Sequence, residues 1–193
     1  MARAFVLYAH PVPDSLNAAA HRVVVETLEG RGWEVDDCDL YAEKFDPVLS
    51  RKEREDYHDT AINTAPVQPY VDRLREAEAF ILCHPVWNFG YPAILKGFFD
   101  RVMLPGVAFD LQEGKLSACL DNIRKIAAVT TYGATPMRAF LAGDPPKRLF
   151  KRAVWGTIRP EKMRYIAQYD MNNITPDGCV AFLNRVQKEM EAF

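Results

Sequence analysis

Three short stretches of this chain hold side chains that could bind a small ligand, and each follows or ends an apolar run. The first, residues 10–18, combines a histidine ring with hydroxyl and amide groups. The second, residues 84–92, is rich in aromatic rings, and the third, residues 130–133, offers two threonine hydroxyls and a glycine. Hydroxyl, amide and N–H donors suit an anion, whereas aromatic faces suit a flat heteroaromatic ligand.

The first stretch has the layout of an anion-binding loop between a strand and a helix. Ser15 is the expected N-cap of a helix that begins near Leu16, and the N–H groups and dipole of that first turn could hold a phosphate. The Asn17 amide and the His10 ring could add hydrogen bonds. A second interpretation stays open here, in which Ser15 only caps the helix and His10 packs at a strand end. Asp14 would repel a phosphate unless its side chain turns outward.

The second and third stretches each allow two interpretations as well. Trp87 and Phe89 could lie along a flat ligand, with Gly90 making a tight turn, or they could form a small aromatic core under the next helix. Residues 130–133 could present hydroxyl and N–H groups to the polar edge of such a ligand, or they could simply end a strand.

Alternating strands and helices must position these stretches. Apolar runs or alternation predict strands at residues 4–9, 33–40, 79–83, 126–131 and 163–169. Helical spacing and cap signals predict helices at residues 17–29, 51–57, 71–76 and 92–102, and a last helix after Thr175. Residues 41–69 form a polar, proline-punctuated excursion.

This alternation predicts an α/β fold, in which a doubly wound, five-stranded parallel sheet is covered by helices on both faces. At 193 residues, the chain is expected to form a single domain over residues 1–193. Ligands of such sheets bind beyond the carboxyl ends of the strands, where the strand order reverses. The three stretches follow the first, third and fourth predicted strands, so we expect them to line one crevice.

Composition and missing motifs exclude several classes of function. The net charge of −2 gives no reason to expect nucleic acid or an anionic membrane as partner, and no apolar run is long enough to insert into a membrane. No Gly-x-Gly-x-x-Gly and no hydrolase motif is present. Without an export signal, four scattered cysteines predict reduced thiols in a cytoplasmic protein, with no metal site.

Several motifs of the chain match one known family in order. They are His10-Pro11 with Ser15-Leu16-Asn17, residues 32–41 and 45–50, Pro85-Val86-Trp87-Asn88-Phe89-Gly90, residues 92–102, and Thr130-Thr131. Over about its first two thirds, the chain resembles the flavodoxin-like NAD(P)H:quinone oxidoreductases. This family includes DT-diaphorase, its bacterial relatives and ancillary subunits of potassium efflux systems. The resemblance implies a flavodoxin-like sheet with the strand order 2-1-3-4-5.

The resemblance also implies a flavin cofactor, with FAD preferred and FMN as the alternative. NAD(P)H would pass a hydride through flavin N5 to a quinone, in a homodimer whose second subunit completes the site. Gly97 fits a closely packed helix near that interface. The residues expected to bind the flavin are His10, Ser15, Leu16, Asn17, Ala18, Pro85, Val86, Trp87, Asn88, Phe89, Thr130, Thr131, Tyr132 and Gly133.

Two departures from the family shape the catalytic and substrate predictions. The Tyr–His pair that lies near the flavin in DT-diaphorase is replaced here, with Arg138 and Ala142 near those positions. Arg138, by its charge, and Tyr132 are therefore the catalytic candidates. Phe109 and Leu111 stand where relatives carry the tyrosines of the substrate cavity, and together with Trp87 they are the expected substrate contacts.

Other functions stay open at this point. An azo dye, a nitroaromatic compound or a free flavin could replace the quinone as acceptor, as in an FMN-dependent azo- or nitroreductase. The chain could instead be a flavin-binding regulatory subunit of a potassium efflux system. A one-electron carrier like flavodoxin fits less well, because such carriers are strongly acidic and this chain has a net charge of only −2.

Overall fold

The computed structural model describes residues 1–112 and 115–193, and the side chains of residues 111–116 lie outside the described part. The strands are β1 (Arg3–Tyr8), β2 (Glu34–Asp39), β3 (Ala79–Val86), β4 (Phe109–Gln112), β5 (Lys115–Ala118), β6 (Lys125–Tyr132) and β7 (Lys162–Gln168). The helices are α1 (Leu16–Gly30), α2 (Arg51–Asp56), α3 (Gln68–Glu76), α4 (Ala93–Val102), α5 (Pro136–Leu141), α6 (Pro145–Leu149), α7 (Trp155–Ile158) and α8 (Pro176–Glu191). Short helical segments are η1 (Ala65–Val67), η2 (Phe150–Val154) and η3 (Met171–Asn173).

Five strands form one parallel sheet in the order β2-β1-β3-β6-β7, which confirms the predicted order 2-1-3-4-5. From β1 the chain first moves to β2 on one side and then returns to β3 on the other. The strand order therefore reverses beside β1, and the carboxyl ends of β1 and β3 flank the position where ligands of such sheets bind.

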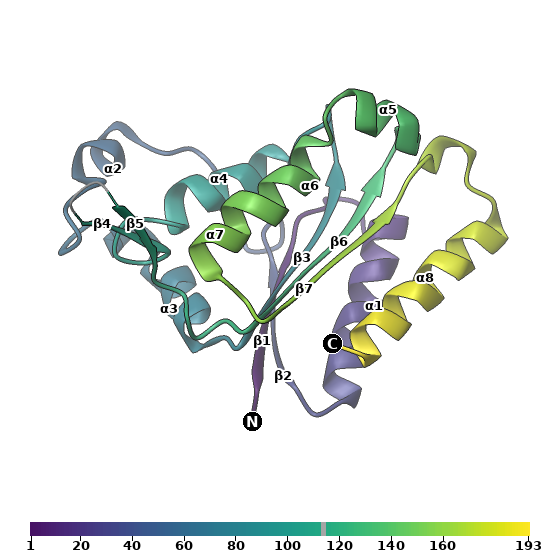
Figure 1. Ribbon diagram of the computed structural model, residues 1–193, viewed down its shortest axis with the longest axis horizontal. Helices are drawn as coiled ribbons and strands as arrows, with labels where there is room; N and C mark the ends of the chain where they lie inside the picture. The colour runs from purple at the N-terminus through teal and green to yellow at the C-terminus, as the bar shows by residue number, and fades with distance from the viewer. Residues whose placement is uncertain (113–114) are drawn as a thin grey trace.

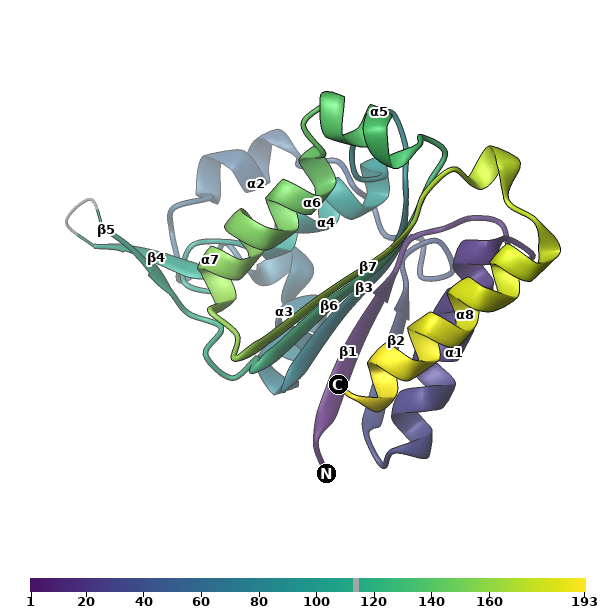
Figure 2. The ribbon, with the colours of Figure 1, turned by 45° about the vertical axis from the view of Figure 1, so that its right-hand side comes forward.

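Helices cover both faces of the sheet, as predicted (Figures 1 and 2). Helices α1 and α8 pack on one face, around a core that includes Val6, Ile81 and Phe182. Helices α3 and α4 and the segment from α6 to α7 cover the other face, over a core that includes Phe5 and Phe98. The alternation of side chains along each strand divides the apolar residues between these two cores.

Local cap signals locate several helix starts correctly. The side chain of Ser15 accepts a hydrogen bond from the N–H of Ala18 at the start of α1, and Thr175 accepts one from Gly178 at the start of α8. Helix α2 begins with a capping box between Ser50 and Glu53. Two regions were not predicted, the β4–β5 hairpin and the helical segment 136–158.

Strands β3 and β6 are longer than predicted, and this changes the local structure of two ligand stretches. Pro85 and Val86 belong to β3 and pair with Thr131 and Tyr132 of β6. Residues 85–86 and Tyr132 were expected beyond the strand ends, so that expectation is wrong, whereas Thr130 and Thr131 lie in the strand that was predicted over residues 126–131. The buried hydrogen-bonding ladder continues to these residues, which fixes their backbones rigidly at the edge of the crevice.

Gly97 lies where α4 meets the excursion that precedes α2. A Cβ atom at Gly97 would lie only 2.3 Å from the carbonyl oxygen of Pro47 and 2.4 Å from its Cα atom. The close packing expected at this glycine is therefore a contact within the chain. It allows the 41–50 segment to lie directly on α4.

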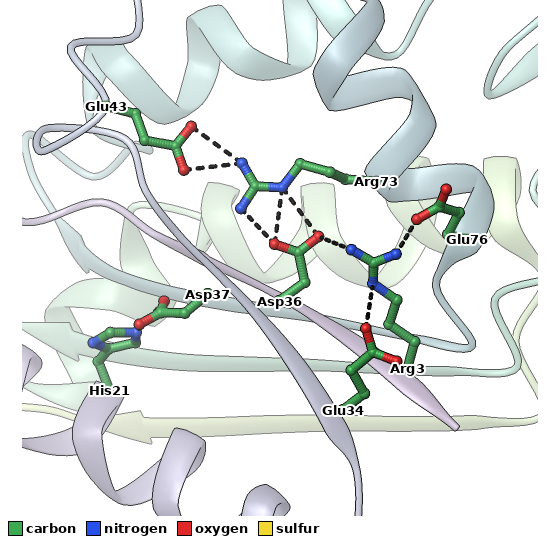
Figure 3. Close-up of polar contacts among 8 residues, drawn as sticks. All are labelled: Arg3, His21, Glu34, Asp36, Asp37, Glu43, Arg73 and Glu76. Carbon is green, nitrogen blue, oxygen red and sulfur yellow. Dashed lines mark hydrogen bonds and ion pairs between the residues drawn. The ribbon is translucent and has the colours of Figure 1, made fainter. Parts of the chain in front are cut away.

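A network of ion pairs holds the outer strand β2 against its neighbours (Figure 3). Asp36 accepts hydrogen bonds from Arg73 of α3 (2.6 Å) and from Arg3 of β1 (3.1 Å), and Arg73 also bonds Glu43 (2.9 Å). Burial alone would lower the pKa of Arg73, but its bonds to Asp36 and Glu43 raise it above the ordinary value. Arg73 therefore stays charged and joins β2, α3 and the 41–50 segment.

Candidate active site

The sheet brings the three predicted stretches to one edge of the molecule. Tyr8 at the end of β1 pairs with Cys83 of β3, and β3 continues beside β6 as far as Tyr132. The rings of His10 and Trp87 lie 5.8 Å apart, so the first and second stretches are in contact. The expected clustering of these stretches is therefore present.

Ser15 and His10 are tied to each other in the first stretch. The Ser15 hydroxyl lies 3.1 Å from Nδ1 of His10, and the N–H of Val12 donates to the same nitrogen at 3.0 Å. Burial lowers the pKa of His10, so the ring is neutral at neutral pH. With Nδ1 accepting, the ring proton belongs on Nε2. Ser15 therefore bonds within its own loop, and the other hydrogen-bond donors of this stretch are available to bind a ligand.

Asn17, in the first turn of α1, has the most informative side chain of this stretch. It is only 2% exposed, and neither its amide nitrogen nor its amide oxygen has a hydrogen-bond partner among the described residues. An unpaired buried amide costs a few kcal/mol unless something bonds to it. Since it lies at the positive end of a 15-residue helix, a phosphate fits it. Asp14 is exposed and can turn away from that position.

The second stretch forms a tight turn between Trp87 and Gly90. The N–H of Gly90 donates to the carbonyl of Trp87 at 2.8 Å, and the N–H of Trp87 donates back at 3.2 Å. The two central residues, Asn88 and Phe89, have φ angles of 48° and 56°. These residues, and not Gly90 as expected, provide the left-handed conformation that such a turn requires.

This turn presents aromatic rings to solvent. Trp87 is 42% exposed and Phe89 is 39% exposed, so neither forms the small buried core that was the alternative interpretation. A bulky residue such as Phe89 with a positive φ is strained, and strain of this kind concentrates at ligand sites. The geometry therefore favours a ligand-facing role for both rings.

The third stretch is more buried than the other two. Thr130 is fully buried, and its hydroxyl has no partner within the described part of the chain. The Tyr132 side chain is only 1% exposed, and its hydroxyl donates to Asp144 at 2.7 Å and lies against the hydroxyl of Tyr165. Burial, together with Tyr165 and Asp144, raises the pKa of Tyr132 above its ordinary value, so this phenol keeps its proton.

Asp144, Tyr165 and Tyr169 complete a cluster that sequence reasoning missed. Tyr169 donates to the other Asp144 oxygen at 3.3 Å, and its ring lies 4.5 Å from that of Tyr132. Asp144 lies at the start of α6, Tyr165 in β7 and Tyr169 just after β7, and no local motif joins them to Tyr132. The Asp144-Pro145 pair signals a helix start, but Asp144 adopts a left-handed conformation and its carboxylate bonds tyrosines instead of capping. Arg138, the other catalytic candidate, is exposed on α5.

The predicted substrate residues lie away from these stretches within one chain. Phe109 starts β4 and packs partly against the core. Strand β5 of the same hairpin contacts α7, and both ribbon views draw the hairpin away from α5 and the carboxyl ends of β3 and β6 (Figures 1 and 2). Leu111 lies in the same strand, and its side chain is outside the described part. Within one chain, the hairpin therefore keeps Phe109 away from the three stretches.

Two further histidines have structural contacts. His84 is fully buried and packs edge-on against Tyr91, and His21 stacks on Tyr8 and pairs with Asp37 at 2.8 Å (Figure 3). The four cysteines are free. In the described residues, no group of acidic, histidine and cysteine side chains could hold a metal ion, and no helix is long and apolar enough to cross a membrane.

A second hollow extends from the first stretch. It has a volume of about 510 Å³ and runs between the start of α1 and the end of β2, where Tyr8, Arg22, Asp39 and Tyr41 line it. Its position gives a ligand bound at Asn17 room to continue away from the sheet.

These features define a doubly wound α/β protein whose candidate ligand-binding residues lie at the carboxyl ends of its central strands. A family model described as "Flavodoxin-like fold" matches residues 2–187. The chain belongs to this family.

Comparison with known proteins narrows the relationship. The chain is 33% identical over 151 residues to NAD(P)H dehydrogenase [quinone] 1 of Cavia porcellus, which covers 70% of this chain and 55% of that protein. It is 30% identical over 161 residues to ribosyldihydronicotinamide dehydrogenase [quinone] of Rattus norvegicus, covering 74% of this chain and 69% of that protein. The chain thus spans about half to two thirds of the length of the curated relatives that it matches.

Solved structures agree over almost the whole chain. Smu.1420 from Streptococcus mutans is 28% identical with a TM-score of 0.87, covering 99% of this chain and 100% of that one. An NAD(P)H:quinone oxidoreductase from Methanothermobacter marburgensis is 21% identical with a TM-score of 0.85, covering 98% of each chain. The second likeness establishes the fold alone.

Proposed function

We propose that this protein is a flavin-dependent NAD(P)H dehydrogenase (quinone). The observation that carries the proposal is the buried, unpaired amide of Asn17 at the start of α1, beside an exposed aromatic turn. The amide of Asn17 suits a phosphate and the aromatic turn suits a flat heteroaromatic ring, and a flavin nucleotide contains both. Two named relatives support the assignment, an NAD(P)H dehydrogenase [quinone] 1 and a ribosyldihydronicotinamide dehydrogenase [quinone].

The bound flavin would supply the redox chemistry by taking a hydride from NAD(P)H at N5 and delivering it, with a proton, to the quinone. The chain's part is to bind and orient. Asn17, His10 and the first turn of α1 hold the phosphate. Trp87 and Phe89 would lie along the ring, the ends of β3 and β6 would hold its polar edge, and Arg138 would balance negative charge.

FAD fits better than FMN. The hollow of about 510 Å³ beside the first stretch could take the adenosine half of FAD, whereas FMN would leave it unused. Tyr41 offers a partly exposed ring there, and Arg22 offers a positive charge beside the carboxylates of Asp37 and Asp39. We propose FAD as the cofactor. Heating the purified protein should release it, and chromatography would identify it.

A homodimer would complete the site. Phe109 and Leu111 can contribute to substrate binding only from a second copy, because their hairpin lies away from the crevice of its own chain. The expected mass in solution is twice the 21.9 kDa of one chain, measured by light scattering. We also propose a cytoplasmic location, where NAD(P)H is supplied.

The central experiment records the visible spectrum of the purified protein and follows NADH and NADPH oxidation with menadione, with methyl red as a second acceptor. A yellow protein that reduces menadione faster than the azo dye supports the proposal. A protein that takes up neither FAD nor FMN contradicts it, and a clear preference for methyl red would make it an azoreductase.

Asn17→Ala tests the binding site itself. We expect roughly 10- to 100-fold weaker flavin binding, because a hydrogen bond to a charged phosphate contributes about 1.5–3 kcal/mol. The flavin-free variant should be no less stable than wild type, because the lost amide is unpaired. Fluorescence titration and thermal unfolding measure the two effects. Asn184→Ala, on the exposed side of α8, is the matched control, and equal flavin affinity in both variants would contradict the site.

A further inference from the structure

A groove of about 450 Å³ lies along α5, α6 and the end of β7, outside the stretches discussed so far. Four cationic side chains of the α6–η2 segment line it, Lys147, Arg148, Lys151 and Arg152. In both ribbon views, α5 and α6 lie beside the carboxyl ends of β6 and β7 (Figures 1 and 2). The groove is therefore on the ligand-binding side of the sheet.

The charges of this groove are largely unpaired. Among the residues that the structure describes, the side chains of Arg148, Lys151 and Arg152 form no hydrogen bond or ion pair. Lys147 is the exception, since its ammonium group lies 3.9 Å from Asp144. The whole chain carries a net charge of −2, so this is a local excess of positive charge. Unpaired cations around a concave surface attract an anionic ligand.

The groove also offers aromatic surface. Phe140 is 73% exposed on its wall, and Tyr169 forms part of its floor. Exposed aromatic rings beside guanidinium groups suit a ligand that joins a flat base to phosphates. A purely acidic peptide would not need the rings, and a neutral ligand would not need the cations.

The floor of the groove is shared with the candidate active site. Asp144 accepts hydrogen bonds from Tyr169, in the groove, and from Tyr132, at the end of β6. One carboxylate therefore joins a residue of the groove to a residue of the third stretch. A ligand whose reactive ring lies at the crevice could place a distant part in the groove.

We propose that this groove binds the adenosine 2′,5′-bisphosphate portion of NADPH and makes NADPH the preferred donor over NADH. The proposal rests on the proposed function, because it names the donor of that same site. The pyrophosphate carries about two negative charges, and the 2′-phosphate of NADPH adds a further one and a half to two. Four cations match the charge of NADPH better than that of NADH, and arginine forks suit phosphate oxygens.

The test uses the flavin-loaded protein and the probe 2′,5′-ADP, with 5′-AMP as the comparison, in calorimetric titrations at two salt concentrations. Wild type should bind 2′,5′-ADP at least roughly tenfold more tightly than 5′-AMP, and high salt should weaken this binding. Arg148→Ala/Arg152→Ala should lose roughly tenfold in affinity and in the ratio of kcat/KM for NADPH to that for NADH. Arg31→Ala/Lys188→Ala removes the same charge from the opposite face of the sheet and should change neither value.

Failure of this proposal and failure of the proposed function give different results. If both donors reduce menadione equally well and 2′,5′-ADP binds no better than 5′-AMP, the groove assignment is overturned while the enzyme function stands. If 2′,5′-ADP binds selectively through Arg148 and Arg152 but neither donor is oxidised, the groove stands and the enzyme function falls. A variant that halves the mass in solution with unchanged nucleotide binding makes the groove a subunit interface and overturns the proposal.

Discussion

His84 shows how a single buried side chain makes stability depend on pH. It lies at the interior of β3, donates from Nδ1 to the Pro85 carbonyl at 2.9 Å, and leaves Nε2 without a partner in the described structure. Burial lowers its pKa from 6.5 to about 4, although the bond to Pro85 offsets part of the effect. The folded protein therefore keeps this ring neutral at pH values where the unfolded chain takes up a proton.

The sign of the resulting pH dependence follows directly. Between pH 6.5 and 4 the unfolded state binds more protons at His84, so the free energy of unfolding falls with falling pH, by at most about 1.4 kcal/mol per pH unit. His84→Gln should flatten this part of the curve in urea unfolding at pH 7.5, 6 and 5. Asn184→Ala, an exposed substitution that removes no titratable group, should keep the wild-type slope, and equal slopes in all three proteins would contradict the assignment.

At the residue scale, the sequence predicted the side chains whose hydrogen-bond partners lie close to them along the chain. Ser15 was correctly expected to cap α1, because capping involves only residues three positions apart. Asp144 and Tyr169 could not be found in this way, since their partner Tyr132 comes from another strand and only the folded sheet joins them. The left-handed pair Asn88 and Phe89 was also missed, because glycine is the usual signal for such a turn.

The helices show the same contrast between local signals and tertiary contacts. Thr175-Pro176 correctly indicated the start of α8, and the identical pair Thr135-Pro136 begins α5. The Thr135-Pro136 pair would therefore have predicted the start of α5, which the sequence analysis left out. The rest of the segment, α6 to α7, includes a π-helical stretch at residues 150–154, and no regular spacing of apolar residues predicts that form.

Gly97→Ala provides a prediction for an element, helix α4. Helix propensity alone favours alanine by about 1 kcal/mol, but the new Cβ would meet backbone atoms of Pro47 at 2.3–2.4 Å. We expect the free energy of unfolding to fall by about 1–3 kcal/mol, as in other overpacked sites. Gly30→Ala, at the end of α1 with nothing within 4 Å of the new atom, is the control. Urea unfolding compares them, and a stabilised Gly97→Ala variant would contradict the contact.

For the whole molecule, the two cores share one sheet and should unfold together. Phe182→Ala, in the core beneath α8, should lower the free energy of unfolding by about 3–4 kcal/mol. Far-ultraviolet circular dichroism and tryptophan fluorescence should still give coincident transitions, because Trp33 and Trp155 lie on opposite faces of the sheet. Val180→Ala, exposed on the same helix, should change stability by less than about 0.5 kcal/mol. Separate transitions would mean two folding units.

The overall arrangement was predictable because alternating buried strands and helices admit few topologies. The placement of Phe109 was not, because a four-residue hairpin strand carries little periodic signal and its orientation depends on what it packs against.

The ion pairs on β2 also bear on how the protein behaves in a crowded solution. An outer strand exposes unpaired backbone groups that another chain can extend into a larger sheet. On β2, Asp36 and Asp37 point to opposite faces, and both are held by cations or histidine within the same molecule. A strand added at this edge would lie against fixed charges on both sides. We therefore expect this edge of the sheet to resist the addition of a strand from another chain.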